Sequence, residues 1–184
     1  MYIGGMKGNL FLILTLLFAW SLSSVCKQLG TAEYIVHMVE GNLPVYWVVP
    51  LFFIVGAIIS FATGTSYGTF AILIPIAVPM SLSLGAPMIP TIAAVLSGGI
   101  FGDHCSPISD TTLLASMGSA CDHIEHVRTQ LPYAILVAVI TFVVYMISFW
   151  LPNPLILLAV LLVAITVVTI LLSKLWGVDT KTMG

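Results

Sequence analysis

Long apolar runs separated by short polar stretches set the hydrophobic pattern of the chain. Residues 9–25, 131–151 and 155–172 are each about long enough to cross the roughly 30 Å apolar core of a bilayer as a helix. The sequence Pro152-Asn153-Pro154 between the last two runs predicts a tight helical hairpin. The pattern therefore predicts an all-α integral membrane protein that crosses the membrane several times.

Two shorter apolar runs, residues 51–62 and 70–84, flank the polar, glycine-bearing stretch 63–69. At about 1.5 Å per residue each run covers roughly 18–22 Å, which falls short of the bilayer core. Two half-length helices that meet at a polar tip predict a re-entrant hairpin, and two short tilted spans fit the same pattern. Pro75 and Pro79 are expected to kink the second helix.

A third apolar run, residues 88–101, leads into the polar stretch 103–110 before helix-like character resumes at residues 111–117. Pro107 lacks a backbone donor and disfavours helix at Ser106. Three glycines are expected to loosen the preceding turn: Gly98, Gly99 and Gly102. The pattern predicts a discontinuous transmembrane helix, unwound at membrane depth.

The more polar segments lie between or before these runs. Residues 27–42 mix charged and apolar side chains, a pattern that suits the membrane interface. Residues 119–130 are the most polar stretch, and we expect an aqueous loop there. The distribution of basic residues places this loop and the C-terminal tail on the cytoplasmic side of the cell membrane.

Composition supports a chain embedded in lipid. Of its 184 residues 60% are hydrophobic and 7% are charged, whereas soluble domains carry about 25% charged residues. The net charge of −2 offers no basic face for nucleic acid. The three cysteines have unrelated spacings and support no disulfide framework, and residues 9–25 lack a small-residue cleavage site, so we expect a retained span. The expected partner is the bilayer, and no cofactor is implied.

Two helix interruptions carry the candidate chemistry. A membrane tolerates interrupted helices only where their free backbone groups line a cavity or bind something. Asp103 and Asp110 lie inside apolar sequence, and an ionisable group at membrane depth costs at least roughly 2.5–3.5 kcal/mol. The other candidate ligands are hydroxyl groups: Thr63, Thr65, Ser66, Thr69, Ser106, Ser109, Thr111 and Thr112. Such oxygen ligands suit a hard cation, and a small alkali ion fits them.

A buried carboxylate holds either a proton or a cation, because burial disfavours its charged form unless a positive charge compensates. We therefore predict that Asp103 and Asp110 bind Na⁺ when ionised and release it when protonated. His104 is a candidate hydrogen-bond partner or proton relay beside Asp103. Alternatively, Asp110 is the N-cap of a helix that begins at Thr111.

Two further alternatives concern the polar stretches. Residues 63–69 form, alternatively, an ordinary turn in which Gly64 and Gly68 provide only backbone freedom. Cys121, His123 and His126 lie within six residues, but their spacing matches no strong zinc signature, so a solvated loop is the better explanation. These two histidines are also candidates for titration near neutral pH that regulates transport.

Two motifs resemble a known family. Residues 61–70 (FATGTSYGTF) and 102–112 (GDHCSPISDTT) resemble the two signatures of the NhaC-type Na⁺/H⁺ antiporter family, and residues 29–34 (LGTAEY) fit it too. The resemblance implies a secondary transporter of the ion transporter superfamily, built from inverted repeats, that carries Na⁺ and H⁺. Tyr67 stands where a Trp is common in that family.

Members of that family are much longer than this chain. The resemblance therefore implies that residues 1–184 form a single membrane domain similar to the C-terminal repeat of a secondary transporter. Because ion sites in such proteins usually form where two repeats meet, a second repeat or another copy of the chain is expected to complete the site.

Three functions remain open at this point. The first is Na⁺/H⁺ antiport, and the second is Na⁺- or H⁺-coupled exchange of an organic anion such as malate or lactate. An organic anion favours a cationic contact at depth, yet Arg128 is the only arginine and lies in the polar loop. The third is a non-transporting fragment or an assembly subunit of a split transporter. No nucleophile with a positioned base emerges, so enzyme activity is not expected.

Overall fold

The computed structural model describes residues 44–151 and 153–176, together with isolated residues nearer the N-terminus. The predicted span over residues 9–25 and the predicted interfacial segment over residues 27–42 lie outside this part of the chain. The helices that the structure describes are η1 (Val45–Trp47), α3 (Val48–Thr63), α4 (Ser66–Leu84), α5 (Met88–Cys105), α6 (Asp110–Gly118), α7 (His123–Ile147) and α8 (Pro154–Trp176). Within these described ranges the chain contains no strand, in agreement with the predicted all-α class.

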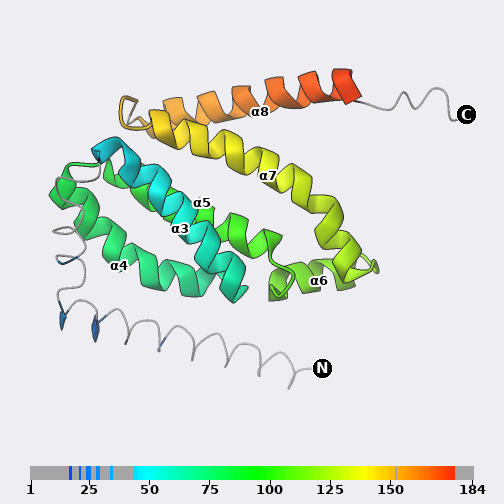
Figure 1. The fold of residues 1–184 in the computed structure, drawn as a ribbon, viewed down its shortest axis with the longest axis horizontal. Coiled ribbons are helices and arrows are strands. Elements are labelled where there is room, and N and C mark those ends of the chain that lie inside the picture. The colour runs from blue at the N-terminus through cyan, green and yellow to red at the C-terminus, as the bar shows by residue number, and fades with distance from the viewer. Residues whose placement is uncertain are drawn as a thin grey trace, which may run out of the picture.

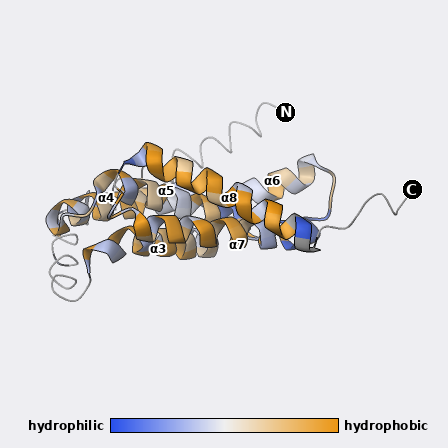
Figure 2. Cartoon of the chain, turned by 90° about the horizontal axis from the view of Figure 1, so that it is seen from above, coloured by the Kyte–Doolittle hydropathy of each residue, from blue (hydrophilic) through white to orange (hydrophobic). Residues whose placement is uncertain are grey.

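Four of the described segments are long and apolar enough to cross a membrane. They are Val45–Thr63, Ser66–Leu84, His123–Ile147 and Pro154–Leu172. Figure 2 shows hydrophobic residues over most of the length of α3, α7 and α8. The structure therefore agrees with a membrane protein whose helices expose apolar side chains to their surroundings.

Helices α3 and α4 meet at the predicted polar tip, but the prediction that both are half-length is wrong, because Val45–Thr63 and Ser66–Leu84 are each long enough to cross a membrane. Gly64 ends α3 with a φ of 66°, a conformation that glycine adopts without strain, and its N–H donates to the Ser60 carbonyl. Thr65 is extended, and α4 begins at Ser66, inside the stretch predicted as the tip. The helices therefore measure about 24 Å and 28 Å at 1.5 Å per residue, longer than the apolar runs alone. Pro75 and Pro79 lie inside α4.

Glycines bring α3 and α5 into close contact. A Cβ at Gly98 would lie 2.3 Å from the Phe53 carbonyl oxygen, and a Cβ at Gly102 would lie 2.2 Å from that of Ala57. Ser60 also donates a hydrogen bond of 2.6 Å across this contact to the Gly99 carbonyl. Small residues four apart allow two helix backbones to approach in this way. The expectation that these glycines loosen the helix is wrong, because α5 continues to Cys105.

The buried core lies among α3, α4 and α5, which pack together in Figure 1. Its residues are mainly Val48, Val49, Phe52, Phe53, Leu73, Ala77, Met80, Ala94 and Val95. Helices α7 and α8 run antiparallel beside this group as a hairpin, as the sequence predicted (Figure 1). Many of their apolar side chains are exposed, including Tyr133 and Leu155 at 74% each. These faces are available to lipid or to another protein segment.

The polar stretch before α7 is shorter than predicted. Asp122 is the N-cap of α7, and its carboxylate accepts a hydrogen bond of 3.0 Å from the N–H of Glu125. An acidic N-cap satisfies amides that the first helical turn leaves free. The prediction of an aqueous loop is therefore wrong for residues 123–130, which form the first two turns of α7.

Candidate functional site

Four residues, Ser106–Ser109, separate α5 from α6. Ser106 and Ser109 both have extended backbone, with ψ values of 127° and 132°. Pro107 explains the end of α5, because proline disfavours helix at the residue before it and has no N–H to donate. The unwound segment is narrower than the predicted residues 103–110, since Asp103 lies in the last turn of α5 and Asp110 begins α6.

The carboxylate of Asp103 is buried beside two hydroxyl groups, and only 6% of this residue is exposed. Ser109 Oγ donates to Asp103 Oδ1 at 2.7 Å, and Thr111 Oγ1 donates to Asp103 Oδ2 at 3.2 Å. The two hydroxyl oxygens are 2.8 Å apart. Because the single Ser109 proton points to the carboxylate, Thr111 is the donor wherever these hydroxyls bond to each other. Four oxygen atoms thus gather at one point, where Asp103 and Ser109 are buried and Thr111 is exposed.

Ser106 and Thr112 bond to backbone carbonyls. Ser106 Oγ donates to the Phe61 carbonyl of α3 at 2.8 Å. Thr112 Oγ1 donates to the His104 carbonyl at 3.2 Å and approaches the Asp103 carbonyl at 3.5 Å. Helix ends leave such carbonyls without intrahelical partners. These two hydroxyls therefore hold the ends of the interruption in place.

The two predicted interruptions lie against each other. A Cβ on Gly64, in the α3–α4 turn, would lie 2.9 Å from the Ile108 carbonyl oxygen in the α5–α6 turn. The hydroxyls around Gly64 bond locally, however. Thr63 Oγ1 donates to the Ile59 carbonyl at 2.8 Å, and Thr69 Oγ1 donates to the Thr65 carbonyl at 3.0 Å. The two turns are therefore in contact, but among the described contacts none of the hydroxyls of Thr63, Thr65, Ser66 and Thr69 bonds to Asp103.

Ser66 and Gly68 complete the first turn of α4. Ser66 is 9% exposed, and Thr65 is half-buried. A Cβ on Gly68 would lie 3.1 Å from Thr65 Cγ2. Gly68 therefore gives room to the neighbouring threonine rather than to a partner from another helix.

Asp110 differs from Asp103 in its surroundings. Its residue is exposed, and its carboxylate has no hydrogen bond or ion pair within the described part of the chain. The alternative in which Asp110 is the N-cap is wrong, because Ser109 is the cap and accepts from the N–H of Thr112 at 3.4 Å. A carboxylate in the first turn still interacts favourably with the helix dipole. Asp110 therefore presents its carboxyl group at the surface of this chain.

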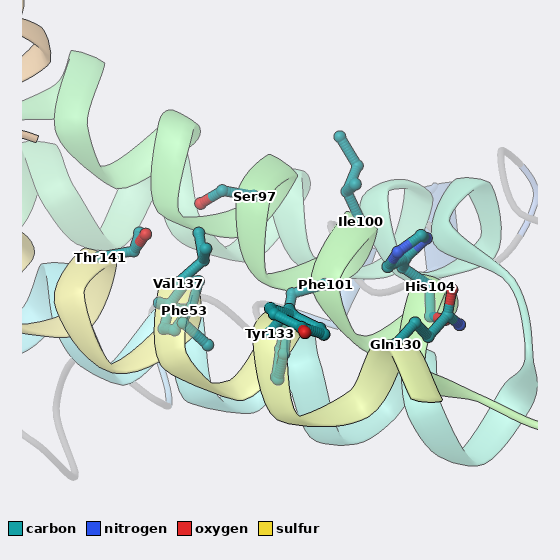
Figure 3. A pocket seen from close by; sticks show the side chains of 11 residues that line it. Phe53, Ser97, Ile100, Phe101, His104, Gln130, Tyr133, Val137 and Thr141 are labelled. Atoms are coloured by element: carbon teal, nitrogen blue, oxygen red, sulfur yellow. The ribbon is translucent and has the colours of Figure 1, made fainter. Parts of the chain in front are cut away.

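His104 faces a different space from Asp103. Its side chain lines a pocket of about 510 Å³ between α5 and α7, together with Gln130, Tyr133 and Phe101. Figure 3 shows His104 and Gln130 at one end of this pocket, and Ser97 and Thr141 toward the other. The remaining wall is mostly aliphatic and aromatic. No hydrogen bond joins the His104 imidazole to Asp103 among the contacts of the described residues.

Two α7 residues contact the interruption and were not recognised as site residues from the sequence. His123 Nε2 lies 2.7 Å from the Pro107 carbonyl oxygen, and its Nδ1 lies 3.1 Å from Ser116 Oγ. Gln130 Nε2 donates to the His104 carbonyl at 2.7 Å. Neither contact has a spacing signal, because both partners are distant in sequence. In the described ranges no group of three or more His, Cys, Asp or Glu side chains is placed to hold a metal ion.

Comparison with known proteins points to transporters. The profile of a family described as the Na⁺/H⁺ antiporter family matches residues 1–150. An uncharacterized protein of Haemophilus influenzae is 43% identical over 148 residues, which are 79% of this chain and 28% of that protein. The arginine/ornithine antiporter ArcD of Halobacterium salinarum is 36% identical over 136 residues, 74% of this chain and 27% of that protein.

A third relative is the malate-2H⁺/Na⁺-lactate antiporter of Bacillus subtilis, 41% identical over 92 residues, 50% of this chain and 20% of that protein. The chain thus spans between a fifth and three tenths of the length of these curated relatives. No solved structure matches the chain.

Proposed function

The chain belongs to the Na⁺/H⁺ antiporter family, and we propose that it supplies one part of the ion site of a Na⁺/H⁺ antiporter in the cell membrane. One observation carries the proposal: the buried Asp103 carboxylate meets the hydroxyls of Ser109 and Thr111 at an interruption between two helices. A buried carboxylate in a membrane helix is expensive and usually functional.

The oxygen cluster suits exchange of a cation for a proton. Carboxylate and hydroxyl oxygens are ligands that hard cations prefer. In the Na⁺-bound state the cation takes the place that the two hydroxyl protons now occupy between Asp103, Ser109 and Thr111, and these hydroxyls turn their lone pairs inward. Protonation of Asp103 removes the negative charge and releases Na⁺. Competition for one carboxylate then gives antiport when the site opens alternately to each side.

Asp110 has a separate role in this proposal. The side chains of Asp103, Ser109 and Thr111 leave part of the cation's coordination open. Asp110, nearby in sequence, offers a carboxylate at the protein surface that has no partner among the described residues. A second repeat, or another copy of the chain, packs against this surface and completes the site. The length of the relatives supports this, because the chain covers only 28% and 27% of two of them.

The arrangement of helices follows from the same proposal. Helices α5 and α6 form one discontinuous transmembrane helix, and α3–α4 forms a hairpin whose turn at Gly64 contacts the interruption. Non-helical backbone survives at membrane depth only inside protein or along a cavity. The two ends of the interruption meet that condition within this chain, with Ser106 and Ser109 at 0% and 1% exposed, whereas Pro107 and Ile108 between them are exposed. The hydroxyls of Thr63, Thr65, Ser66 and Thr69 are proposed as ligands from the hairpin side when the site rearranges.

A second candidate function is Na⁺- or H⁺-coupled exchange of an organic acid or amino acid. The names of two relatives, an arginine/ornithine antiporter and a malate-2H⁺/Na⁺-lactate antiporter, support it. The α5–α7 pocket of about 510 Å³ is large enough for a small metabolite, but its wall is mostly apolar. A charged organic acid would lose hydration there with few partners, so the ion-only reading is preferred.

Na⁺-dependent stabilisation in lipid nanodiscs tests the site, with the full chain purified alone and together with the remaining part of a full-length relative, which supplies the second repeat. A bound ion stabilises the folded state by about 2.7 kcal/mol when its concentration is one hundred times the dissociation constant. We expect Na⁺, but not choline, to raise the unfolding temperature, and we expect Asp103→Asn to abolish this rise. Glu125→Gln is the control, because Glu125 is an exposed carboxylate in the first turn of α7. An equal rise in wild type and Asp103→Asn would contradict the proposal.

Flux measurements separate the functional alternatives. Proteoliposomes that contain the chain, alone or with the remaining part of a full-length relative, are given a Na⁺ gradient, and internal pH is followed by a dye. Antiport predicts proton movement with Na⁺ and H⁺ alone. A strict requirement for added organic acid would favour the second candidate, whereas no flux in any combination would favour a non-transporting assembly subunit.

A further inference from the structure

We propose that His123 is a positioning residue for the ion site: it holds the Ser106–Ser109 turn from the α7 side and thereby fixes the Ser109 hydroxyl against Asp103. This inference rests on the proposed function. His123 is the first residue of α7, lies sixteen residues from Pro107 in sequence, and is half-buried. Its Nε2 atom is 2.7 Å from the Pro107 carbonyl oxygen.

Hydrogen-bond counting fixes the proton on Nε2. The Pro107 carbonyl only accepts, so a bond at 2.7 Å requires a proton on His123 Nε2. The other ring nitrogen, Nδ1, lies 3.1 Å from Ser116 Oγ, which itself lies 2.8 Å from the Leu113 carbonyl. In the neutral ring Ser116 donates to Nδ1, and in the charged ring it accepts from Nδ1 and donates to Leu113. The bond to Pro107 persists in both states.

The turn is held from two opposite helices. On the α3 side, Ser106 Oγ donates to the Phe61 carbonyl at 2.8 Å, and Gly64 lies directly against Ile108. On the α7 side, the bond from His123 is the contact to the turn. Pro107 and Ile108 are otherwise exposed, with Ile108 at 67%. Loss of the α7 contact therefore leaves the Pro107 carbonyl without this hydrogen bond, while Ile108 still packs against Gly64.

The turn determines where the Ser109 hydroxyl lies. Ser109 follows Pro107 by two residues. Its Oγ donates to Asp103 Oδ1 at 2.7 Å and also accepts the hydrogen bond that caps α6. A second hydrogen bond from α7, donated by Gln130 Nε2 to the His104 carbonyl at 2.7 Å, lies on the α5 side of the interruption. Helix α7 thus bonds to the chain on both sides of Ser106, at the His104 and Pro107 carbonyls. A movement of α7 relative to α3 would therefore shift the groups around Asp103, because α7 bonds to the Pro107 and His104 carbonyls.

Three variants of the full chain in nanodiscs test the inference. His123→Ala removes the donor, and His123→Gln keeps a side-chain N–H at similar reach. His126→Ala is the matched control, because it lies one turn along the same helix and its imidazole has no hydrogen bond within the described ranges. Each variant is measured for backbone amide exchange over residues 108–112 and for Na⁺ affinity from Na⁺-dependent thermal unfolding.

We expect His123→Ala to exchange about tenfold faster over residues 108–112 and to bind Na⁺ about tenfold more weakly, as loss of a supporting contact typically does. We expect His123→Gln to recover most of both properties and His126→Ala to match wild type. Unchanged exchange in His123→Ala would overturn the inference, and so would faster exchange with unchanged affinity. Absence of Na⁺ binding in wild type, both alone and with the remaining part of a full-length relative, would refute the proposed function instead. The exchange comparison would still decide whether His123 holds the turn.

Discussion

Replacing Gly102 by alanine tests whether the site depends on close contact between α3 and α5. A Cβ there would lie 2.2 Å from the Ala57 carbonyl oxygen and 2.8 Å from the Phe61 nitrogen. Both atoms belong to the backbone of α3, so rotation of a side chain cannot relieve the clash. Helix α5 must move by about 0.8 Å to lengthen the shorter contact to 3.0 Å, the lower limit of real Cβ contacts.

The expected cost follows from this displacement. Overpacking a close contact costs about 1–3 kcal/mol, and a gap of 0.5–1 Å forfeits roughly a quarter to a half of each dispersion contact along the interface. The higher helix propensity of alanine returns about 1 kcal/mol. Overpacking less the gain in helix propensity gives about 0–2 kcal/mol, and the lost dispersion contacts add to this, so we expect Gly102→Ala to lower the free energy of unfolding by roughly 1–3 kcal/mol. It should also weaken Na⁺-dependent stabilisation, because Asp103 is the next residue.

Unfolding by sodium dodecyl sulfate in mixed micelles, followed by far-ultraviolet circular dichroism, measures the effect. The control is Gly118→Ala, because Gly118 is the last residue of α6 and a Cβ there meets no atom within 4 Å. We expect this control to be as stable as wild type or slightly more stable. If Gly102→Ala matched Gly118→Ala in stability, the helices would not be in the close contact described here, and the reasoning would be refuted.

Two further pairs of substitutions extend this test. Ser109→Ala removes the α6 cap, worth about 1 kcal/mol, and a hydrogen bond to a carboxylate, worth about 1.5–3 kcal/mol. Chemical unfolding should show a larger loss of stability than for Thr111→Val, whose bond to Asp103 is longer at 3.2 Å. Equal losses of stability would argue against the Asp103 cluster. Gly64→Ala and Gly85→Ala both place alanine at positive φ, at 66° and 69°, which costs roughly 1–2 kcal/mol. Only Gly64 also contacts Ile108, so Gly64→Ala should be the less stable of the two in thermal unfolding, and the reverse order would contradict contact between the two turns.

The helices were predictable where one local signal dominated. The apolar runs before and after residues 152–154 predicted the α7–α8 hairpin, and Pro107 predicted an end to helix at Ser106. The boundaries were less predictable where polar residues are compatible with helix. Ser66 to Thr69 and residues 123–130 looked like tip and loop, yet both are helical, the second because Asp122 caps α7.

The candidate site was predictable in its residues but not in its pairing. Asp103, Ser109 and Thr111 were all expected as ligands, and the structure brings them together. Asp110 has the same residue type and a similar position in sequence, but it is exposed. The direction of a side chain near a helix start depends on where that helix begins. The structure fixes this start, because Ser109 is the N-cap and Asp110 is the first residue of α6.

The sequence by itself determined that this chain belongs in a membrane, where its long helices fall, and that oxygen-bearing residues gather at two interruptions. Those features follow from local composition, because hydropathy and proline act over neighbouring residues. Only the tertiary structure decided that Gly64 meets Ile108, that glycines bring α5 against α3, and that His123 binds the Pro107 carbonyl. These contacts join residues that are distant in sequence, and their existence depends on how whole helices pack rather than on any local pattern.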